Sequence, residues 1–185
     1  MTWGREVSPE VAHTRLLDAA GAVAARRGDI DLTVAEVAAE AGCARGTVYR
    51  YVGDRDALRR AFVARESRRV AAAMAVEVAG VDEPDALLVE AVVAAVAQVR
   101  ARPLLAAWFS EGAAGATGRI ALQAEVLHEL VVDFVAALVE PGADADLAAE
   151  AVVRLVLSLL AVPADPARER RLIEVLAPPV LAAAS

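Results

Sequence analysis

The chain has 185 residues and a net charge of −7, and it is 58% hydrophobic but only 4% aromatic because alanine and valine supply 74 residues. A single cysteine excludes an internal disulfide framework, and the acidic balance taken alone disfavours a general binder of nucleic acid or anionic membranes. The N-terminus has no apolar signal segment, and the longest strongly apolar run, about residues 155–164, falls short of the roughly 20 residues of a membrane span, so we expect a cytoplasmic protein with no membrane partner.

The first predicted helix covers residues 9–27. Ser8-Pro9-Glu10 supplies an N-cap, a proline at the first helical position and an acidic first turn. Arg26-Arg27-Gly28 supplies a basic last turn and a glycine that ends the helix.

Two short helices and a long one are expected next. Thr33 and Glu36 form a capping box before an apolar face, and Gly42 ends this helix after about two turns. A second short helix is expected over residues 45–51, and a long one over residues 55–78. Two short helices joined by a glycine turn indicate a helix-turn-helix.

Beyond residue 80, valine and alanine recur at helical rather than alternating spacing, and strand signals are weak. The expected helices cover residues 82–102, 104–109, 119–140, 144–161 and 166–182. The predicted fold class is all-α, with an N-terminal domain of residues 1–56 joined by a long helix to a helical bundle of residues 57–185.

Within the helix-turn-helix, Ala38, Gly42 and Val48 are spaced as small and apolar contacts between two steeply packed helices. The outer face of the second helix is then rich in groups that hydrogen-bond to bases and phosphates. These groups are Arg45, Thr47, Tyr49, Arg50 and Tyr51. The alternative interpretation is an αα-hairpin with a polar outer face.

Three segments carry a family resemblance: Leu16-Leu-Asp-Ala-Ala ending at Arg27-Gly28, the 33–42 helix, and Arg45-Gly-Thr-Val-Tyr-Arg-Tyr followed by Asp54-Arg-Asp-Ala-Leu58. Through them the chain resembles the TetR/AcrR family of bacterial transcriptional regulators over about residues 10–65. The resemblance implies a three-helix DNA-binding domain whose segment 45–51 enters the major groove. It also implies a helical C-terminal domain that dimerises and usually binds an effector.

The same resemblance implies which residues contact bases or phosphates. They are Thr33, Arg45, Gly46, Thr47, Tyr49, Arg50, Tyr51 and Arg55. Ala44 departs from the pattern where a capping serine or threonine is common, and Val52 stands where phenylalanine is usual. Residues 1–70 carry a net charge of +2 and residues 71–185 one of −9, so the acidic balance lies outside the motif.

The resemblance places an effector pocket among the helices between about residues 60 and 140. Candidate lining residues, with Met74 a weaker one, are Trp108, Phe109, Gln123, His128 and Phe134. With so few hydrogen-bonding groups available, a small and mainly apolar effector is expected, although each residue fits plain core packing as well.

The last two predicted helices form the expected homodimer interface, because small alanines permit close approach and a two-fold axis uses one apolar face twice. The candidate residues are Ala151, Arg154, Leu155, Ser158, Leu159, Leu172, Val175 and Leu176. The alternative is that these faces are buried within one chain.

No catalytic or metal-binding constellation is visible, so we expect neither an enzyme nor a cofactor. Cys43 fits a buried spacer in the turn, with a redox-sensing thiol as the alternative, and Gly112, Gly115 and Gly118 fit a flexible connector. The predicted function is a ligand-responsive repressor that binds a near-palindromic double-stranded DNA operator as a dimer. The alternative is a helical ligand-binding or scaffold protein of the same fold that has lost operator binding.

Overall fold

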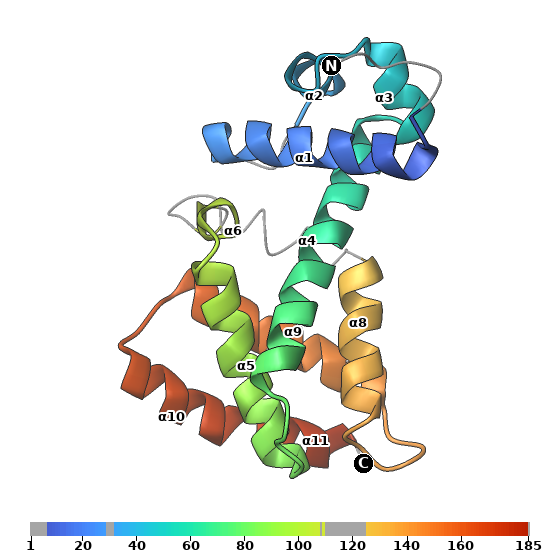
Figure 1. Cartoon of the computed structure of the whole chain (residues 1–185). Coiled ribbons are helices and arrows are strands. Elements are labelled where there is room, and N and C mark those ends of the chain that lie inside the picture. Colours follow the sequence, from blue (N-terminus) through green and yellow to red (C-terminus); the bar gives the residue numbers. More distant parts are fainter. Residues whose placement is uncertain (1–6, 29–31, 108, 110–124, 185) are drawn as a thin grey trace. The chain divides into compact units, whose positions relative to one another are not determined.

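The computed structural model in Figure 1 describes residues 7–28, 32–107, 109 and 125–184, and all regular structure within these ranges is helical. The predicted all-α class is therefore confirmed. The chain divides into two compact units, residues 1–65 and 66–185. None of the described helices has the length and apolarity needed to cross a membrane.

The first unit contains α1 (Pro9–Arg27), α2 (Val34–Glu40), α3 (Arg45–Tyr51) and the beginning of α4 (Arg55–Glu77). The predicted signals define α1, because the Ser8 side chain accepts a hydrogen bond from the Val11 amide and Gly28 ends the helix in the left-handed conformation at φ 65°. The capping box at the start of α2 is also present. The four N-terminal helices thus confirm the sequence prediction to within a residue or two.

The core of the first unit lies where α1, α2 and α3 pack against one another. All four helices supply side chains that are inaccessible to solvent. These include Leu16, Ala20, Val37, Val48, Leu58 and Phe62. Apolar burial of this kind contributes about 1.5–3 kcal/mol for each large side chain, so the orientation of the short helices depends on it.

The second unit contains α5 (Pro84–Arg100), α6 (Pro103–Ala107), α8 (Glu125–Ala136), α9 (Ala145–Ala161), α10 (Pro166–Leu176) and α11 (Pro178–Ala184), together with the end of α4. Helix α9 packs against α5, α8 and α11, and α10 packs against α5 and α11. The helices α5, α8, α9, α10 and α11 surround one apolar core, whose fully buried members include Leu88, Val92 and Val135.

One predicted helix was wrong, because the segment 166–182 forms two helices rather than one. Helix α10 ends at Leu176, and α11 begins at Pro178. Pro178 has no amide hydrogen to continue the helical ladder, and its ring restricts Ala177 before it. The predicted 119–140 helix also ends earlier, at Ala136, and its first six residues, like the predicted connector at Gly112, Gly115 and Gly118, lie outside the described residues.

Candidate nucleic-acid interface

Helix α3 is held in the first unit by a single buried side chain. It has seven residues, and Val48 alone among them is buried. Arg45, Gly46 and Arg50 are exposed, and the Tyr49 side chain is 56% exposed. The helix therefore offers most of its surface to a ligand outside the chain.

The turn between α2 and α3 sets the steep angle between these helices. Gly42 has a φ of 65°, in the left-handed region that glycine adopts without a steric penalty. The Gly42 amide donates to the Ala39 carbonyl at 3.2 Å, and the Cys43 amide donates to the Ala38 carbonyl at 2.9 Å. This pair of bonds is a Schellman motif, so Gly42 ends α2 and redirects the chain into α3.

The remaining predicted contact residues of α3 are partly enclosed. Thr47 and Tyr51 are half-buried, and the Arg50 guanidinium carbon lies 5.4 Å from the centre of the Tyr51 ring. At this distance a cation–π interaction holds the Arg50 and Tyr51 side chains together. The helix thus presents a paired arginine and tyrosine besides the exposed Arg45 and Tyr49.

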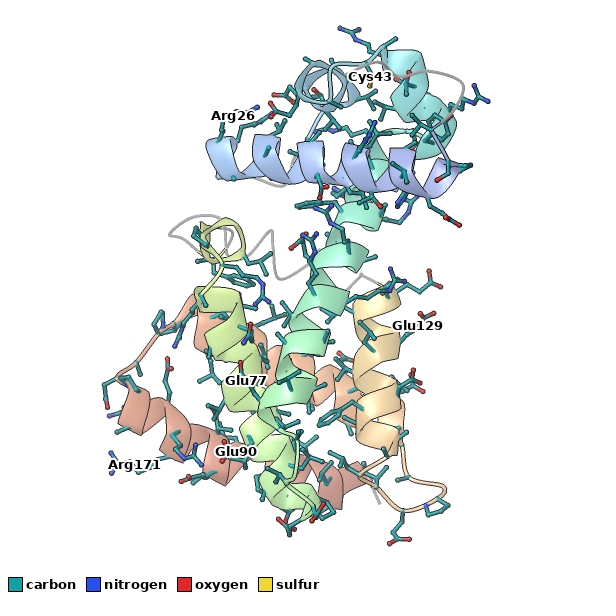
Figure 2. The ribbon with its side chains drawn as sticks, in the orientation of Figure 1. Arg26, Cys43, Glu77, Glu90, Glu129 and Arg171 are labelled. Carbon is teal, nitrogen blue, oxygen red and sulfur yellow. The ribbon has the colours of Figure 1, made fainter. Side chains whose placement is uncertain are left out.

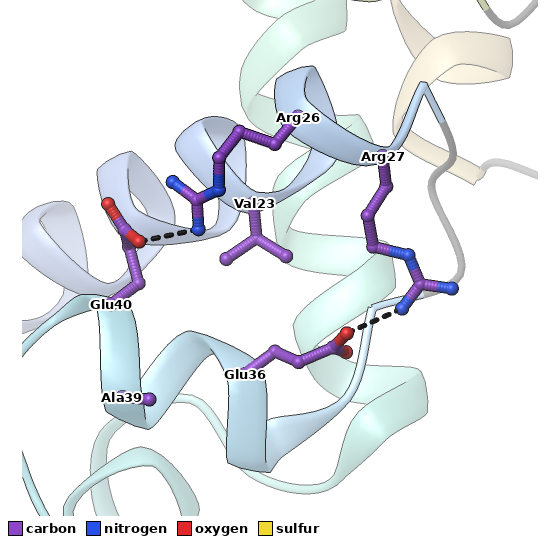
Figure 3. Close-up of a pocket in the computed structure, with 6 residues that line it drawn as sticks. All are labelled: Val23, Arg26, Arg27, Glu36, Ala39 and Glu40. Atoms are coloured by element: carbon purple, nitrogen blue, oxygen red, sulfur yellow. Dashed lines mark hydrogen bonds and ion pairs between the residues drawn. The ribbon is translucent and has the colours of Figure 1, made fainter.

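Two ion pairs neutralise the arginines at the end of α1. Arg26 lies 2.6 Å from Glu40 and Arg27 lies 2.7 Å from Glu36, with both carboxylates on α2. Figure 3 shows the two ion pairs with Val23 between them. The pairs flank an open depression of about 310 Å³, which Val23 also lines. Sequence analysis missed these pairs, although glutamates four residues apart on α2 were a signal that its outer face could bind an arginine pair.

In contrast, Arg45 and Arg50 have no carboxylate partner among the residues that the structure describes. Both exposed arginines of α3 therefore carry positive charge that no carboxylate among these residues compensates. A phosphate-bearing ligand is attracted most strongly where cationic side chains lack an internal counter-ion.

Thr33 has its hydroxyl engaged at the start of α2. Its Oγ1 donates to Glu36 Oε2 at 2.6 Å and accepts from the Glu36 amide at 3.2 Å, while its own amide donates to Glu36 Oε2 at 3.0 Å. The two bonds that the Glu36 carboxylate accepts, first that from the Thr33 hydroxyl and then that from the Thr33 amide, lower the pKa of Glu36, and the nearby Arg27 lowers it further. A phosphate contact from Thr33 stays a prediction, and it requires the hydroxyl hydrogen to leave an ionised carboxylate.

Arg55 is exposed at the first position of α4, and its Nε donates to the Leu32 carbonyl at 3.3 Å. Asp54 precedes it and accepts from the Ala57 amide at 2.8 Å, as an N-cap does. Arg55 is thus connected to the segment before α2. Its predicted contact with the DNA backbone stays a prediction.

The Cys43 environment disfavours a reactive thiol. Partial burial raises the pKa of the Cys43 thiol, and a hydrogen bond with the Thr47 side chain opposes that rise. Reactive cysteines have the opposite shift, because the thiolate is the nucleophile. The spacer interpretation therefore fits the surroundings of Cys43 better than the redox alternative, and the contact occupies the Thr47 side chain.

The predicted effector residues of the second unit do not form one described group. Phe109 and Phe134 are half-buried against the apolar core, whereas His128 Nε2 lies 2.9 Å from Asp146 Oδ1 between α8 and α9, with its side chain 43% exposed. Trp108 and Gln123 lie outside the described residues. No group of three or more potential metal ligands occurs among the residues described.

The predicted dimer residues have different environments on the two helices. On α9, Leu159 is buried in the core of its own unit, Ala151 and Leu155 are half-buried, and Arg154 is paired with Glu150. Ser158 is exposed. The α10 residues form an apolar surface, exposed at Leu172 (38%), Val175 (68%) and Leu176 (48%).

Comparison with known proteins places this geometry in context. Residues 16–62 match the model of the bacterial regulatory proteins of the tetR family. MT1294, an uncharacterized HTH-type transcriptional regulator of Mycobacterium tuberculosis (strain CDC 1551 / Oshkosh), is 36% identical over 178 residues, which are 95% of this chain and 88% of that protein.

Solved structures share the fold over nearly the whole chain. The TetR family repressor AlkX from Dietzia sp. strain DQ12-45-1b has a TM-score of 0.66 at 21% identity, covering 98% of this chain and 100% of its own. The TetR family repressor QsdR from R. erythropolis has a TM-score of 0.65 at 17% identity, covering 95% and 97%. These likenesses confirm the predicted helical architecture with an N-terminal helix-turn-helix.

Because α3 lacks a side-chain cap, we expect a capping residue at its N-terminus to stabilise the first unit. Ala44 occupies the N-cap position in extended conformation, and its side chain makes no capping hydrogen bond. We expect Ala44→Ser to raise the free energy of unfolding of the first unit by about 1 kcal/mol, because serine can accept from an amide of the first turn. Urea denaturation followed by circular dichroism measures the change. The control Ala25→Ser, at an exposed position within α1, should be neutral or slightly destabilising. An equal effect of both substitutions would contradict the capping argument.

Proposed function

Because the chain belongs to the TetR family of bacterial transcriptional regulators, we propose that it is a repressor whose α3 binds a specific double-stranded DNA operator. The observation that carries this proposal is the combination of one buried residue, Val48, with exposed Arg45, Gly46, Tyr49 and Arg50 on the same short helix. A helix in this position of a helix-turn-helix enters the major groove with its N-terminal residues toward the bases.

The exposed groups of α3 suit different parts of the operator. Arg45, in the first turn, can donate two parallel hydrogen bonds to a guanine, and the hydroxyl of Tyr49 can donate to a base edge or a phosphate. Arg50, stacked on Tyr51, is suited to the sugar–phosphate backbone. Thr33, Thr47 and Arg55 complete the proposed contact set, of which Thr33 and Thr47 require rearrangement of internal hydrogen bonds.

We further propose that the protein acts as a homodimer through α10. The exposed Leu172, Val175 and Leu176 lie on one face of that helix. Arg171 and Glu174 beside them carry opposite charges, so a two-fold partner with an antiparallel α10 can place unlike charges opposite each other. Two α3 helices held about 34–36 Å apart would engage the two halves of a near-palindromic operator.

Regulation by a small, mainly apolar effector completes the proposal. Phe109 and Phe134 border the core of the second unit and can line an apolar site there. The repressor AlkX is implicated in the biodegradation of n-alkanes, which are apolar compounds. Effector binding would weaken operator affinity if it favours a conformation with a different spacing of the two α3 helices.

Selection from randomised duplex DNA with the purified full chain tests the central proposal. We expect enrichment of one near-palindromic sequence that competes effectively against unrelated duplex at physiological salt. Binding that is weak, independent of sequence and lost on raising the salt would contradict it and favour a helical protein of this fold without an operator.

The contact assignment of α3 is tested by Arg45→Ala and Tyr49→Phe. Loss of a bidentate arginine–guanine contact should weaken operator binding by about 1–3 kcal/mol and relax the preference at one base pair. Tyr49→Phe should weaken binding less, because only a hydroxyl is removed. Fluorescence anisotropy with operator and mismatched duplexes measures both.

The control Arg26→Ala removes an arginine that is already paired with Glu40, so unchanged affinity is expected. Equal affinities for all three variants would reject α3 as the recognition helix.

Replacing Gly46 should have opposite effects on stability and on operator affinity. It lies within α3 in a helical conformation, and a Cβ added there meets no atom of the described residues within 4 Å beyond its chain neighbours and the backbone of its own helix. Gly46→Ala should therefore raise the free energy of unfolding by about 0.5–1 kcal/mol through helix propensity. It should also weaken operator binding at least about tenfold, because the added methyl group separates α3 from the DNA. Thermal unfolding and anisotropy test the pair of effects, and unchanged operator affinity would show that no close approach occurs at Gly46.

The dimer surface is tested by Val175→Glu. A carboxylate buried at the two-fold interface without a partner should raise the dissociation constant of the dimer by at least about 100-fold. Sedimentation equilibrium measures this constant. The control Val76→Glu changes another exposed valine, 78% exposed on α4, and should leave the constant unchanged. A wild-type chain that is monomeric at tens of micromolar would contradict the dimer itself.

A further inference from the structure

Helix α10 carries apolar residues over a wider arc of its surface than it buries, which leaves its rotation weakly specified by burial alone. Ile173 is buried and Ala177 follows it four residues later, also buried, whereas Leu172, Val175 and Leu176 are exposed. At about 100° per residue, a rotation of α10 by about a quarter turn about its own axis would bury Leu172 and Leu176 in place of Ile173 and Ala177. Some additional interaction must decide which set faces the core.

The buried face of α10 begins with a charged residue, Glu169, which is 6% exposed and four residues before Ile173. Its Oε2 accepts from Arg100 Nη1 at 2.6 Å, and its Oε1 accepts from Arg100 Nη2 at 2.8 Å. Oε1 also accepts from the Ala164 amide at 2.8 Å. Both carboxylate oxygens are therefore occupied, in the bidentate geometry that arginine favours.

Arg100 connects this carboxylate to two other elements. It lies at the C-terminal end of α5, and its Nη2 also donates to the Leu159 carbonyl of α9 at 2.9 Å. The hydrogen bonds of Arg100 lower the pKa of Glu169, so the pair remains charged near neutral pH. The Arg100 guanidinium thus ties the end of α9 and the first turn of α10 to α5, and Glu169 in turn holds the connection at Ala164.

The next residue of α10 makes a second attachment to α5. Arg170 is paired with Glu90, ten residues before Arg100 and therefore about 15 Å away along α5, and with Glu174 at 3.0 Å. Figure 2 shows Arg171, the following residue, extending away from α10 on the side opposite α5. Two consecutive residues of α10, whose side chains leave the helix in different directions, are therefore anchored to different turns of α5.

Rotating α10 to bury Leu172 and Leu176 would withdraw the Glu169 carboxylate from its three donors. The Ala164 amide would then lose its acceptor, and a carboxylate with little access to water would lose its counter-charge. Breaking one partner of such a pair is costly, whereas the pair itself adds little net stability over an apolar replacement. The pair is therefore suited to selecting one orientation.

We propose that Glu169 and Arg100 are the positioning pair of the self-association surface, and that they set the rotation of α10 which presents Leu172, Val175 and Leu176 to a second copy of the chain. The inference rests on the dimer put forward above, and it adds a residue pair that has no place in the interface itself. Glu169 acts through α10 and does not contact the partner.

Thiol labelling measures the rotation directly in the full chain. In a Cys43→Ser background, one variant carries Ile173→Cys on the inner face and another carries Leu176→Cys on the outer face. Each is labelled with a maleimide at a concentration at which sedimentation shows monomers. With Glu169 intact, the outer thiol should react faster. Adding Glu169→Gln should change the ratio of the two rates by at least about tenfold toward the inner thiol, because α10 then samples other rotations. The same substitution in the native sequence should raise the dimer dissociation constant at least about tenfold.

The outcomes separate this inference from the dimer proposal. An unchanged ratio of labelling rates, or an equal acceleration of both thiols, would overturn the positioning role, since general loosening of the fold affects both faces alike. A monomeric wild-type chain would contradict the dimer, and the labelling ratio would still decide whether Glu169 sets the rotation. Glu129→Gln, an exposed carboxylate on α8, removes the same charge and should change neither measurement. If Glu169→Gln does not fold, Arg100→Lys keeps the charge without the two parallel bonds and should shift the ratio in the same direction.

Discussion

The burial of Val48 is the constraint on which the proposed DNA-facing surface depends. Helix α3 has seven residues, and no other side chain of it is buried. Isolated helices of this length are unstable in water, so its order comes from packing against α1 and α2. The Schellman motif at Gly42 determines the direction in which α3 leaves α2, and the buried valine determines its rotation. Together they determine that Arg45, Tyr49 and Arg50 face outward.

The distribution of charge follows the same division. The whole-chain charge of −7 averages residues 1–65, whose net charge is +1, with residues 66–185, whose net charge is −8. Within the first unit, Glu36 and Glu40 neutralise the two arginines at the end of α1, while Arg45 and Arg50 on α3 keep their charge uncompensated among the described residues. Phosphate binding depends on the potential at one surface, so a modest number of uncompensated arginines there is enough in a chain whose net charge is negative.

Sequence analysis predicted the elements whose signals are local. The limits of α1 and α3 and the capping box at Thr33 follow from residues within one or two turns of each end. It did not predict that α10 and α11 are separate helices, because the apolar periodicity continues across Pro178. The proline itself was the available signal. The pair of Arg100 with Glu169 joins residues 69 positions apart and leaves no pattern in the sequence. Apolar periodicity marks which residues share a helix face, but it does not show whether that face packs within the chain or against a partner. It therefore could not predict that Leu159 is buried in its own unit, whereas Val175 is exposed.

Stability and recognition are assigned to different residues of α3. Gly46 lowers helix propensity, and Ala44 provides no cap, so both residues weaken the helix in the free protein. A helix selected for stability alone would have neither feature. Because Val48 supplies the packing, the positions around it can serve the proposed contact with DNA at little risk to the fold. Helix α10 shows the same arrangement in another form, since Ile173 packs inward while Val175 is left exposed. In both helices the buried side chain fixes an orientation, and the exposed side chains are free to serve a partner.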